Sequence, residues 1–129
     1  MIKTKIAGSI VNVSSVCGIS SFPKSLPYVI SKAGMDMATK QFALELGPYG
    51  IRVNSVNPTM VATPLIAHLI ETDHVTEETI TSRTPMGRIM QIQECVDPIL
   101  YLLSEHSSMV TGQMHVLDGG LLSNITVNV

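Results

Sequence analysis

The sequence is organised around Tyr28-Val29-Ile30-Ser31-Lys32-Ala33-Gly34, residues 28–34. This stretch opens a run of good helix formers that continues to Leu46. One mostly apolar stripe along the run, at helical spacing, consists of Val29, Ala33, Met37 and Gln41. Gly47-Pro48 follows, and proline cannot continue a helix, so we expect a helix over residues 28–46.

Short β-branched stretches flank this predicted helix. Residues 9–14 precede it and are bounded by Gly8, whereas residues 51–57 follow it and end at Pro58. Both stretches predict strands, because β-branched residues favour strands and proline ends them. A last strand is expected at residues 114–117, before the turn Asp118-Gly119-Gly120.

Helical patterns fill the region between the second and the last strand. Two short helices are expected near residues 64–70 and 76–83, and a firmer one over residues 93–103. One face of the firmer helix carries Val96, Ile99, Leu100 and Leu103. Strands separated by helices imply right-handed crossovers and a parallel sheet. Three strands are few for such a sheet, so we predict an α/β chain that forms part of a larger doubly wound sheet.

Composition limits the class of protein. The 129 residues fit one domain at most, and 45% hydrophobic with 14% charged residues indicates a real core. A net charge of −2 without a basic run argues against nucleic acid as a partner, and no apolar stretch approaches the roughly 18 residues of an integral membrane segment. Neither the two cysteines nor the histidines have the spacing of a metal site; the histidines are His68, His74, His106 and His115. The first residues contain no apolar signal core, so we expect a cytoplasmic protein.

A candidate catalytic group lies at the start of the long predicted helix. Tyr28 and Lys32 are four residues apart, which places both side chains on one face of the helix, one turn apart. A cation beside a phenol favours the phenolate, so such a tyrosine gives up its proton more readily to a carbonyl oxygen near neutral pH. Ser15 follows the first predicted strand, at the carboxyl end where open α/β sheets bind their ligands, and its hydroxyl can orient the same oxygen.

The Tyr28–Lys32 pair alone is a weak signal, because most pairs at this spacing lie on a solvated helix face. Its context is more specific. Ile10-Val11-Asn12-Val13-Ser14-Ser15 precedes the tyrosine, and Ile51-Arg52-Val53-Asn54-Ser55-Val56-Asn57-Pro58 follows the helix. With these segments, residues 8–120 resemble the second half of the classical short-chain dehydrogenase/reductase fold, which is a doubly wound parallel sheet of the Rossmann type.

The resemblance implies a function and a set of residues. It implies an NADP(H)-dependent reduction of a small-molecule carbonyl substrate, with Ser15 orienting the substrate, Tyr28 donating the proton and Lys32 also binding the nicotinamide ribose. The same resemblance implies that the loop beginning at Pro58 contacts the cofactor through Pro58, Val61 and Thr63. Thr59 stands where the family commonly has glycine, and Asn57-Pro58-Thr59 is typical of the branch that contains L-xylulose (dicarbonyl) reductases. That branch implies a small ketose such as xylulose, or an α-dicarbonyl, as the substrate.

The half of the family's fold that carries the glycine-rich dinucleotide turn has no counterpart here, because Gly8, Gly18 and Gly34 are isolated. We therefore expect residues 1–129 to form the C-terminal, catalytic portion of one NAD(P)-binding domain, as a fragment of an intact homo-oligomeric enzyme, a dimer or a tetramer. NAD remains an alternative to NADP, because the residues that select between them belong to the other half. A second interpretation is a catalytically inactive short product that acts as an interaction module or misfolds.

Overall fold

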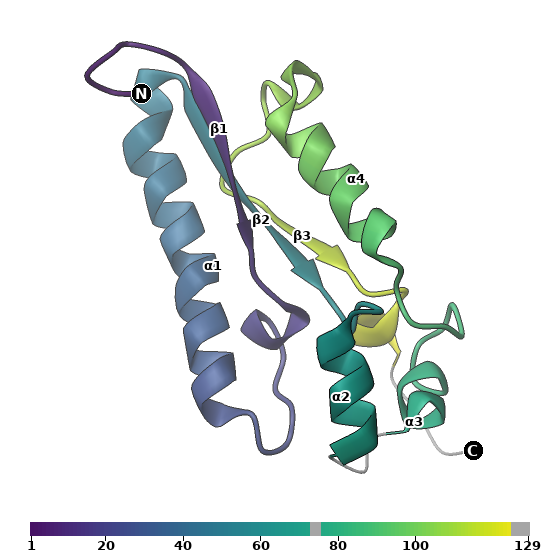
Figure 1. Cartoon of the computed structure of the whole chain (residues 1–129). Coiled ribbons are helices and arrows are strands. Elements are labelled where there is room, and N and C mark those ends of the chain that lie inside the picture. The colour runs from purple at the N-terminus through teal and green to yellow at the C-terminus, as the bar shows by residue number, and fades with distance from the viewer. Residues whose placement is uncertain (73–75, 125–129) are drawn as a thin grey trace.

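The computed structural model describes residues 1–72 and 76–124, in which strands and helices alternate (Figure 1). The helices and strands are β1 (Gly8–Val13), α1 (Leu26–Leu46), β2 (Ile51–Pro58), α2 (Pro64–Thr72), α3 (Glu77–Thr81), α4 (Ile92–Leu103) and β3 (Met114–Leu117). Single turns of 3-10 helix are η1 (Val16–Gly18), η2 (Gly47–Tyr49), η3 (Glu105–Ser107) and η4 (Leu121–Ser123). Every element expected from the sequence is present; His74 lies outside the described residues.

The three strands form one parallel sheet in the order β1-β2-β3, which confirms the α/β prediction. Ile10 pairs with Val53 across β1 and β2, and Val56 pairs with His115 across β2 and β3. Successive side chains of a strand point to opposite faces of the sheet. Helix α1 covers the face of Val53, whereas α4 lies on the opposite face (Figure 1).

The apolar core lies between α1 and the sheet. Ala43 of α1 packs with Ile51 and Val53 of β2, and Ile10 and Leu46 border this cluster. Val53 is fully buried because β2 is the central strand, with a neighbour on each side and α1 above it. The strand that leads to the site is therefore held along its length.

The buried face of α1 is not the stripe that indicated the helix. Asp36, Thr39 and Ala43 face the sheet, whereas Met37 in the middle of the stripe is 64% exposed. Hydrophobic spacing identified the helix but not the side on which it packs, because the sheet offers polar partners to Asp36 and Thr39. Likewise in α4, Leu102 is fully buried while Leu100 and Leu103 are exposed.

Arg52 of β2 joins the sheet to the C-terminal end of α4. Its guanidinium donates to the carbonyl oxygens of Leu102 at 2.9 Å and Ser104 at 3.0 Å, and to Ser107 Oγ at 2.8 Å. The last carbonyls of a helix lack partners within the helix and carry partial negative charge, so a cation stabilises this end. Ser9 Oγ of β1 donates to the same Leu102 carbonyl at 2.7 Å.

The turn after β3 requires its glycines. Gly119 and Gly120 have φ values of 60° and 89°, which glycine adopts without the steric cost that a side chain imposes. A Cβ on Gly119 would lie 2.8 Å from Thr84 Cγ2. The carboxyl group of Asp118 accepts hydrogen bonds from the backbone N–H groups of Gly120 and Leu122 and closes the turn.

Within the described part of the chain, no helix has the length and apolar character needed to cross a membrane. Nor do the described residues bring three or more histidine, cysteine, aspartate or glutamate side chains together as a metal site.

Candidate active site

Ser15 lies just beyond the carboxyl end of β1 and is buried. It caps the single turn η1, because its Oγ accepts a hydrogen bond from the backbone N–H of Cys17 at 3.1 Å. Its carbonyl oxygen accepts from the backbone N–H of Gly18 and from Asn57 Nδ2, both at 2.9 Å. The backbone of Ser15 is therefore held from two sides, and its hydroxyl keeps its proton available as a donor.

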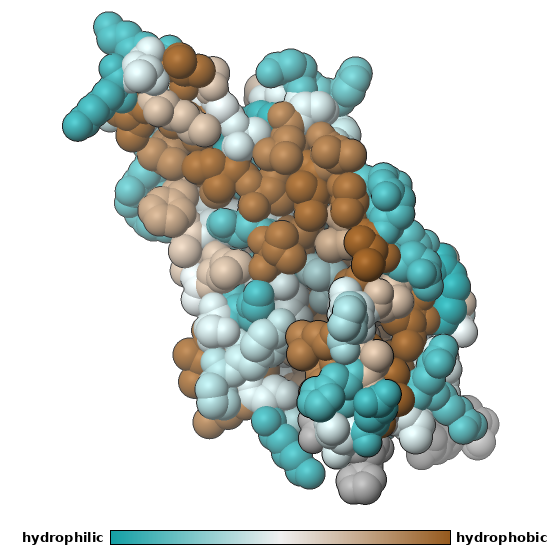
Figure 2. Space-filling model, in the orientation of Figure 1, coloured by the Kyte–Doolittle hydropathy of each residue, from teal (hydrophilic) through white to brown (hydrophobic). Residues whose placement is uncertain are grey.

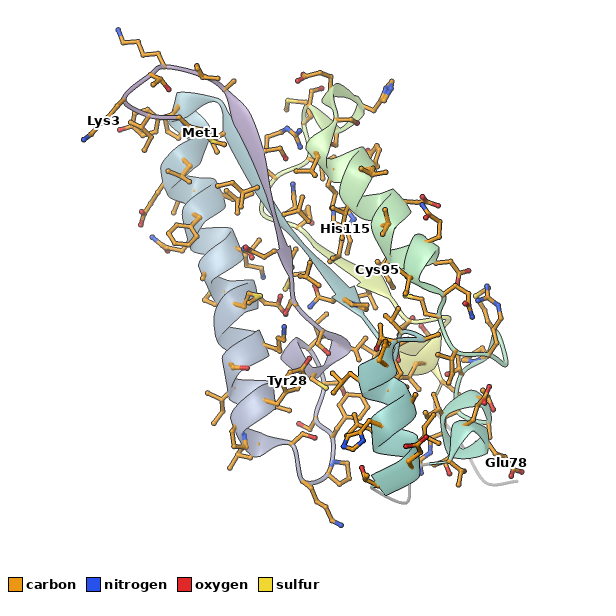
Figure 3. The ribbon with its side chains drawn as sticks, in the orientation of Figure 1. Met1, Lys3, Tyr28, Glu78, Cys95 and His115 are labelled. Atoms are coloured by element: carbon orange, nitrogen blue, oxygen red, sulfur yellow. The ribbon has the colours of Figure 1, made fainter. Side chains whose placement is uncertain are left out.

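Tyr28 and Lys32 lie in the first two turns of α1. Figure 3 shows Tyr28 beside the loop that follows β1. Lys32 Nζ lies 5.5 Å from the centroid of the Tyr28 ring, within the range of a cation–π contact. The same Nζ donates to the carbonyl oxygen of Val13 at 3.0 Å, and Ser14 Oγ donates to the carbonyl oxygen of Lys32 at 3.3 Å. These bonds attach the start of α1 to the end of β1, next to Ser15.

Tyr28 is half exposed, with 49% of the residue accessible to solvent. Among residues 1–72 and 76–124, no hydrogen-bond partner competes for its hydroxyl. A half-exposed phenol with a cation over its ring can donate a proton to a molecule that enters from solvent. The sequence prediction that the tyrosine and the lysine lie together on one face is consistent with this geometry.

The loop after β2 leaves the same carboxyl edge of the sheet (Figure 1). Pro58 is buried at the end of β2, directly after Asn57, whose side chain contacts Ser15. Val61 forms an isolated parallel bridge with Met90, and the Thr63 carbonyl accepts from the Ala67 N–H at the start of α2. The structure thus places Pro58 next to the serine loop, whereas Val61 and Thr63 lie farther along and are held by other segments.

A buried polar cluster lies beneath Ser15, and sequence reasoning did not single it out. Asp36 of α1 accepts hydrogen bonds from Asn57 Nδ2 at 2.7 Å and Ser55 Oγ at 3.1 Å. Ser55 Oγ lies 3.0 Å from Asn57 Oδ1, and all three residues are buried. The signal was present in the sequence, because Ser55 and Asn57 alternate on one face of the strand, and Asp36 lies one turn beyond Lys32.

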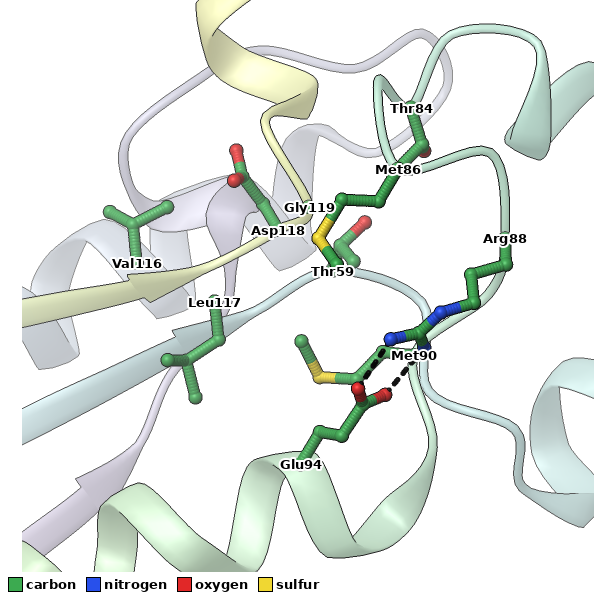
Figure 4. Close-up of a pocket in the computed structure, with 10 residues that line it drawn as sticks. All are labelled: Thr59, Thr84, Met86, Arg88, Met90, Glu94, Val116, Leu117, Asp118 and Gly119. Carbon is green, nitrogen blue, oxygen red and sulfur yellow. Dashed lines mark hydrogen bonds and ion pairs between the residues drawn. The ribbon is translucent and has the colours of Figure 1, made fainter.

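A separate hollow of about 250 Å³ lies between β3, the start of α4 and the preceding loop (Figure 4). Its lining consists of Thr59, Thr84, Met86, Arg88, Met90, Glu94, Val116, Leu117, Asp118 and Gly119. Two hydrogen bonds, of 2.6 and 2.7 Å, join Arg88 to Glu94, and they lower the pKa of the Glu94 carboxyl to about 2. The hollow contains none of Ser15, Tyr28 and Lys32, so we do not assign the chemistry to it.

Comparison with known proteins places these features in a family. The family model described as enoyl-(acyl carrier protein) reductase matches residues 1–122. The L-xylulose reductase of Mus musculus is 42% identical over 123 residues, which cover 95% of this chain and 50% of that protein. The carbonyl reductase [NADPH] 2 of Sus scrofa is 39% identical over 124 residues, covering 96% of this chain and 50% of that protein.

Solved structures show the same arrangement of elements. The chain matches a 4-hydroxyisoleucine dehydrogenase complexed with NADH with a TM-score of 0.88 and 34% identity. The match covers 95% of this chain and 50% of the dehydrogenase. The chain thus spans about half the length of the curated relatives and of the solved structure that it matches.

Proposed function

The chain belongs to the short-chain dehydrogenase/reductase family of oxidoreductases, and from this premise we propose that it is the catalytic portion of an NADP(H)-dependent carbonyl reductase. The observation that carries the proposal is the contact between Lys32 Nζ and the Tyr28 ring, at the carboxyl edge of the sheet and one loop away from Ser15. This is the edge at which open parallel sheets bind ligands.

In the proposed reaction Tyr28 donates its hydroxyl proton to the oxygen of the substrate carbonyl. Lys32 lies against the phenol ring and stabilises the phenolate that remains after proton transfer. Ser15 donates a hydrogen bond to the same carbonyl oxygen and holds it within reach of Tyr28. NADPH, when bound, supplies the hydride that reduces the carbonyl carbon and becomes NADP⁺.

The residues present fit the nicotinamide end of the cofactor. Lys32 has three N–H donors, of which the Val13 carbonyl uses one, so others can reach the hydroxyls of a ribose. Pro58, Val61 and Thr63 complete the proposed contacts, with Tyr28 also against the ribose. The glycine-rich turn that receives a dinucleotide pyrophosphate in this family has no match in the sequence, so that contact is assigned to the other half of the fold.

NADP is proposed ahead of NAD because the porcine relative is named for NADPH, although the 4-hydroxyisoleucine dehydrogenase was solved with NADH. The similarity to L-xylulose reductase supports a small ketose such as xylulose, or an α-dicarbonyl, as the substrate. We place the reaction in the cytoplasm, because the thiols of Cys17 and Cys95 are both free, as expected in a reducing compartment.

The surface supports assembly with further chains or segments. On α1 an exposed apolar stripe includes Ile30, Met37 and the 74%-exposed Leu44, which supports packing of this helix against that of a second copy in a homodimer or tetramer. Figure 2 shows apolar side chains gathered over β1 and α4. Val13, the last residue of β1, is half exposed. In the described residues β1 pairs with β2 alone, so its other edge can receive the rest of a doubly wound sheet.

The same apolar surfaces support the second candidate, an inactive chain that acts as an interaction module. The two candidates differ in whether Tyr28 performs chemistry. The test is NADPH oxidation by the chain with xylulose or diacetyl as substrate, both for the chain alone and after joining it to the dinucleotide-binding half of a relative. In whichever of these two forms is active, replacing Tyr28 with phenylalanine should lower kcat on the order of a hundredfold or more, with nucleotide binding retained.

A Tyr28→Phe variant with near-normal turnover would remove the tyrosine from the mechanism. If neither the chain alone nor the joined protein binds nucleotide or reduces a carbonyl, the result would favour the interaction module. The control is Tyr101→Phe, since Tyr101 is a similarly exposed tyrosine on α4, on the opposite face of the sheet.

A further inference from the structure

We propose that Asp36 is a positioning residue for the site: through Asn57 it holds the carbonyl of Ser15 and thereby fixes where the Ser15 hydroxyl lies relative to Tyr28 and Lys32. The relevance of this to turnover rests on the proposed function, since it takes Ser15 as the group that orients the substrate. The placement of Ser15 itself is a property of the folded chain and does not depend on turnover.

Asp36 holds Asn57 in one orientation. Asn57 is fully buried, and its Nδ2 group donates to Asp36 at 2.7 Å and to the Ser15 carbonyl at 2.9 Å. A side-chain amide has two N–H donors, so these two bonds use its whole donor capacity. If Asp36 were replaced by an apolar residue, one N–H of Asn57 would lose its partner in a buried environment, and the amide would gain freedom to rotate away from Ser15.

The buried cluster of Asp36, Ser55 and Asn57 also fixes the turn that Ser15 caps. Gly18, in η1, lies so close to Asp36 that a Cβ there would meet the Asp36 carboxyl oxygen at 2.2 Å and the Lys32 carbonyl oxygen at 3.0 Å. The backbone of η1 therefore rests directly on the carboxyl group. Asp36 contacts the serine loop twice, once through Asn57 and once through Gly18.

Asp36 lies on the same helix as Tyr28 and Lys32. Asp36 is one helical turn beyond Lys32 and two turns beyond Tyr28, on the side of α1 that faces the sheet. One buried carboxyl group thus joins α1, β2 and the loop after β1, and these three segments supply the proposed serine, tyrosine and lysine. A shift of α1 along the sheet would break the bonds of Asp36 to β2 and move Tyr28 and Lys32 together relative to Ser15.

Two backbone amides report directly on the position of Ser15. The N–H of Cys17 donates to Ser15 Oγ, and the N–H of Gly18 donates to the Ser15 carbonyl. The experiment measures hydrogen exchange at these amides, and at amides of β2, in the 129-residue chain and its variants. In Asp36→Ala we expect exchange at Cys17 and Gly18 to accelerate at least about tenfold more than in β2, as expected for the loss of one buried hydrogen bond.

Two variants separate positioning from general stability. Asp36→Asn should behave like the parent, because its oxygen accepts from Asn57 and its amide donates to Ser55 Oγ, which in turn donates to Asn57 Oδ1. Thr39→Val is the matched control. Thr39 is fully buried on the same face of α1 and bonds to Asn12 Nδ2, so its loss should accelerate exchange without selecting Cys17 and Gly18.

If Asp36→Ala does not fold, the same measurement is made at Cys17 in Gly18→Ala, whose new methyl group displaces the carboxyl group from the other side. Equal acceleration at all amides, no acceleration, or a parent in which Cys17 and Gly18 exchange as in an unfolded chain would each overturn the proposal. Turnover is a separate readout: where the parent reduces a carbonyl, Asp36→Ala should lower kcat at least about tenfold with the KM for NADPH within about twofold, because Lys32 keeps its bonds. Selective exchange in a chain that reduces no carbonyl, either alone or joined to the dinucleotide-binding half of a relative, would contradict the proposed function and leave the positioning role supported.

Discussion

Replacing Arg52 with methionine should weaken the attachment of α4 to the sheet and lower the free energy of unfolding. The hydrogen bonds of Arg52 set the size of this loss. Methionine keeps most of the apolar stem but removes three hydrogen bonds of 2.8 to 3.0 Å from a charged donor. Bonds of this kind contribute about 1.5 to 3 kcal/mol each, and the lower end applies because Arg52 is only partly buried. The Leu102 carbonyl keeps its bonds from Ser9 and Ser107, so we expect a net loss of about 3 kcal/mol in the free energy of unfolding.

Urea unfolding followed by circular dichroism measures this loss. With a slope of about 1.5 kcal/mol per molar urea, the midpoint should fall by about 2 M while the slope stays unchanged. Arg52→Lys is the control: its ammonium can reach one of the carbonyls but not all three acceptors, so its midpoint should lie between those of Arg52→Met and the parent. An Arg52→Met midpoint within about 0.3 M of the parent would refute the view that this guanidinium holds the end of α4.

Three further predictions concern the site and the hollow beside β3. Lys32→Met should raise the KM for NADPH and lower kcat, each by at least about tenfold, because one ammonium contacts both the Tyr28 ring and the proposed ribose site; steady-state kinetics that change in only one constant would contradict this double role. Arg88 lowers the pKa of Glu94 from 4.5 to about 2, so their ion pair stabilises the folded chain above about pH 4.5 and this contribution is lost as the pH falls to about 2. Glu94→Gln should therefore melt below the parent at pH 7 and together with it near pH 2, and a constant difference in melting temperature across that range would show that the charge of Glu94 is not what matters. Gly119→Ala should lower the free energy of unfolding by about 1 to 2 kcal/mol, because its φ of 60° and the 2.8 Å approach to Thr84 both disfavour a Cβ; an unchanged melting curve would mean that the turn rearranges without cost.

The sequence by itself determined the elements of this protein and the residues proposed for its chemistry. Strand and helix periods are local properties, so β-branched runs, the proline at the end of β2 and the glycine turn after β3 were sufficient to predict the parallel α/β order. The proximity of Tyr28 and Lys32 also follows from local sequence, because residues four apart on a helix share a face. The structure places the Lys32 ammonium over the Tyr28 ring.

Only the tertiary structure decided which face of α1 is buried and what holds Ser15. The apolar stripe through Met37 pointed to a helix, but Asp36 and Thr39 face the sheet because polar side chains of β2 and of β1, respectively, bond to them. The bond from Asn57 to Ser15 spans 42 positions in the sequence, and that from Arg52 to Leu102 spans 50. Such contacts depend on how helices and strands are placed against one another, and no local period in the sequence encodes that placement. The free energy of a buried polar group depends on partners that only the assembled fold supplies.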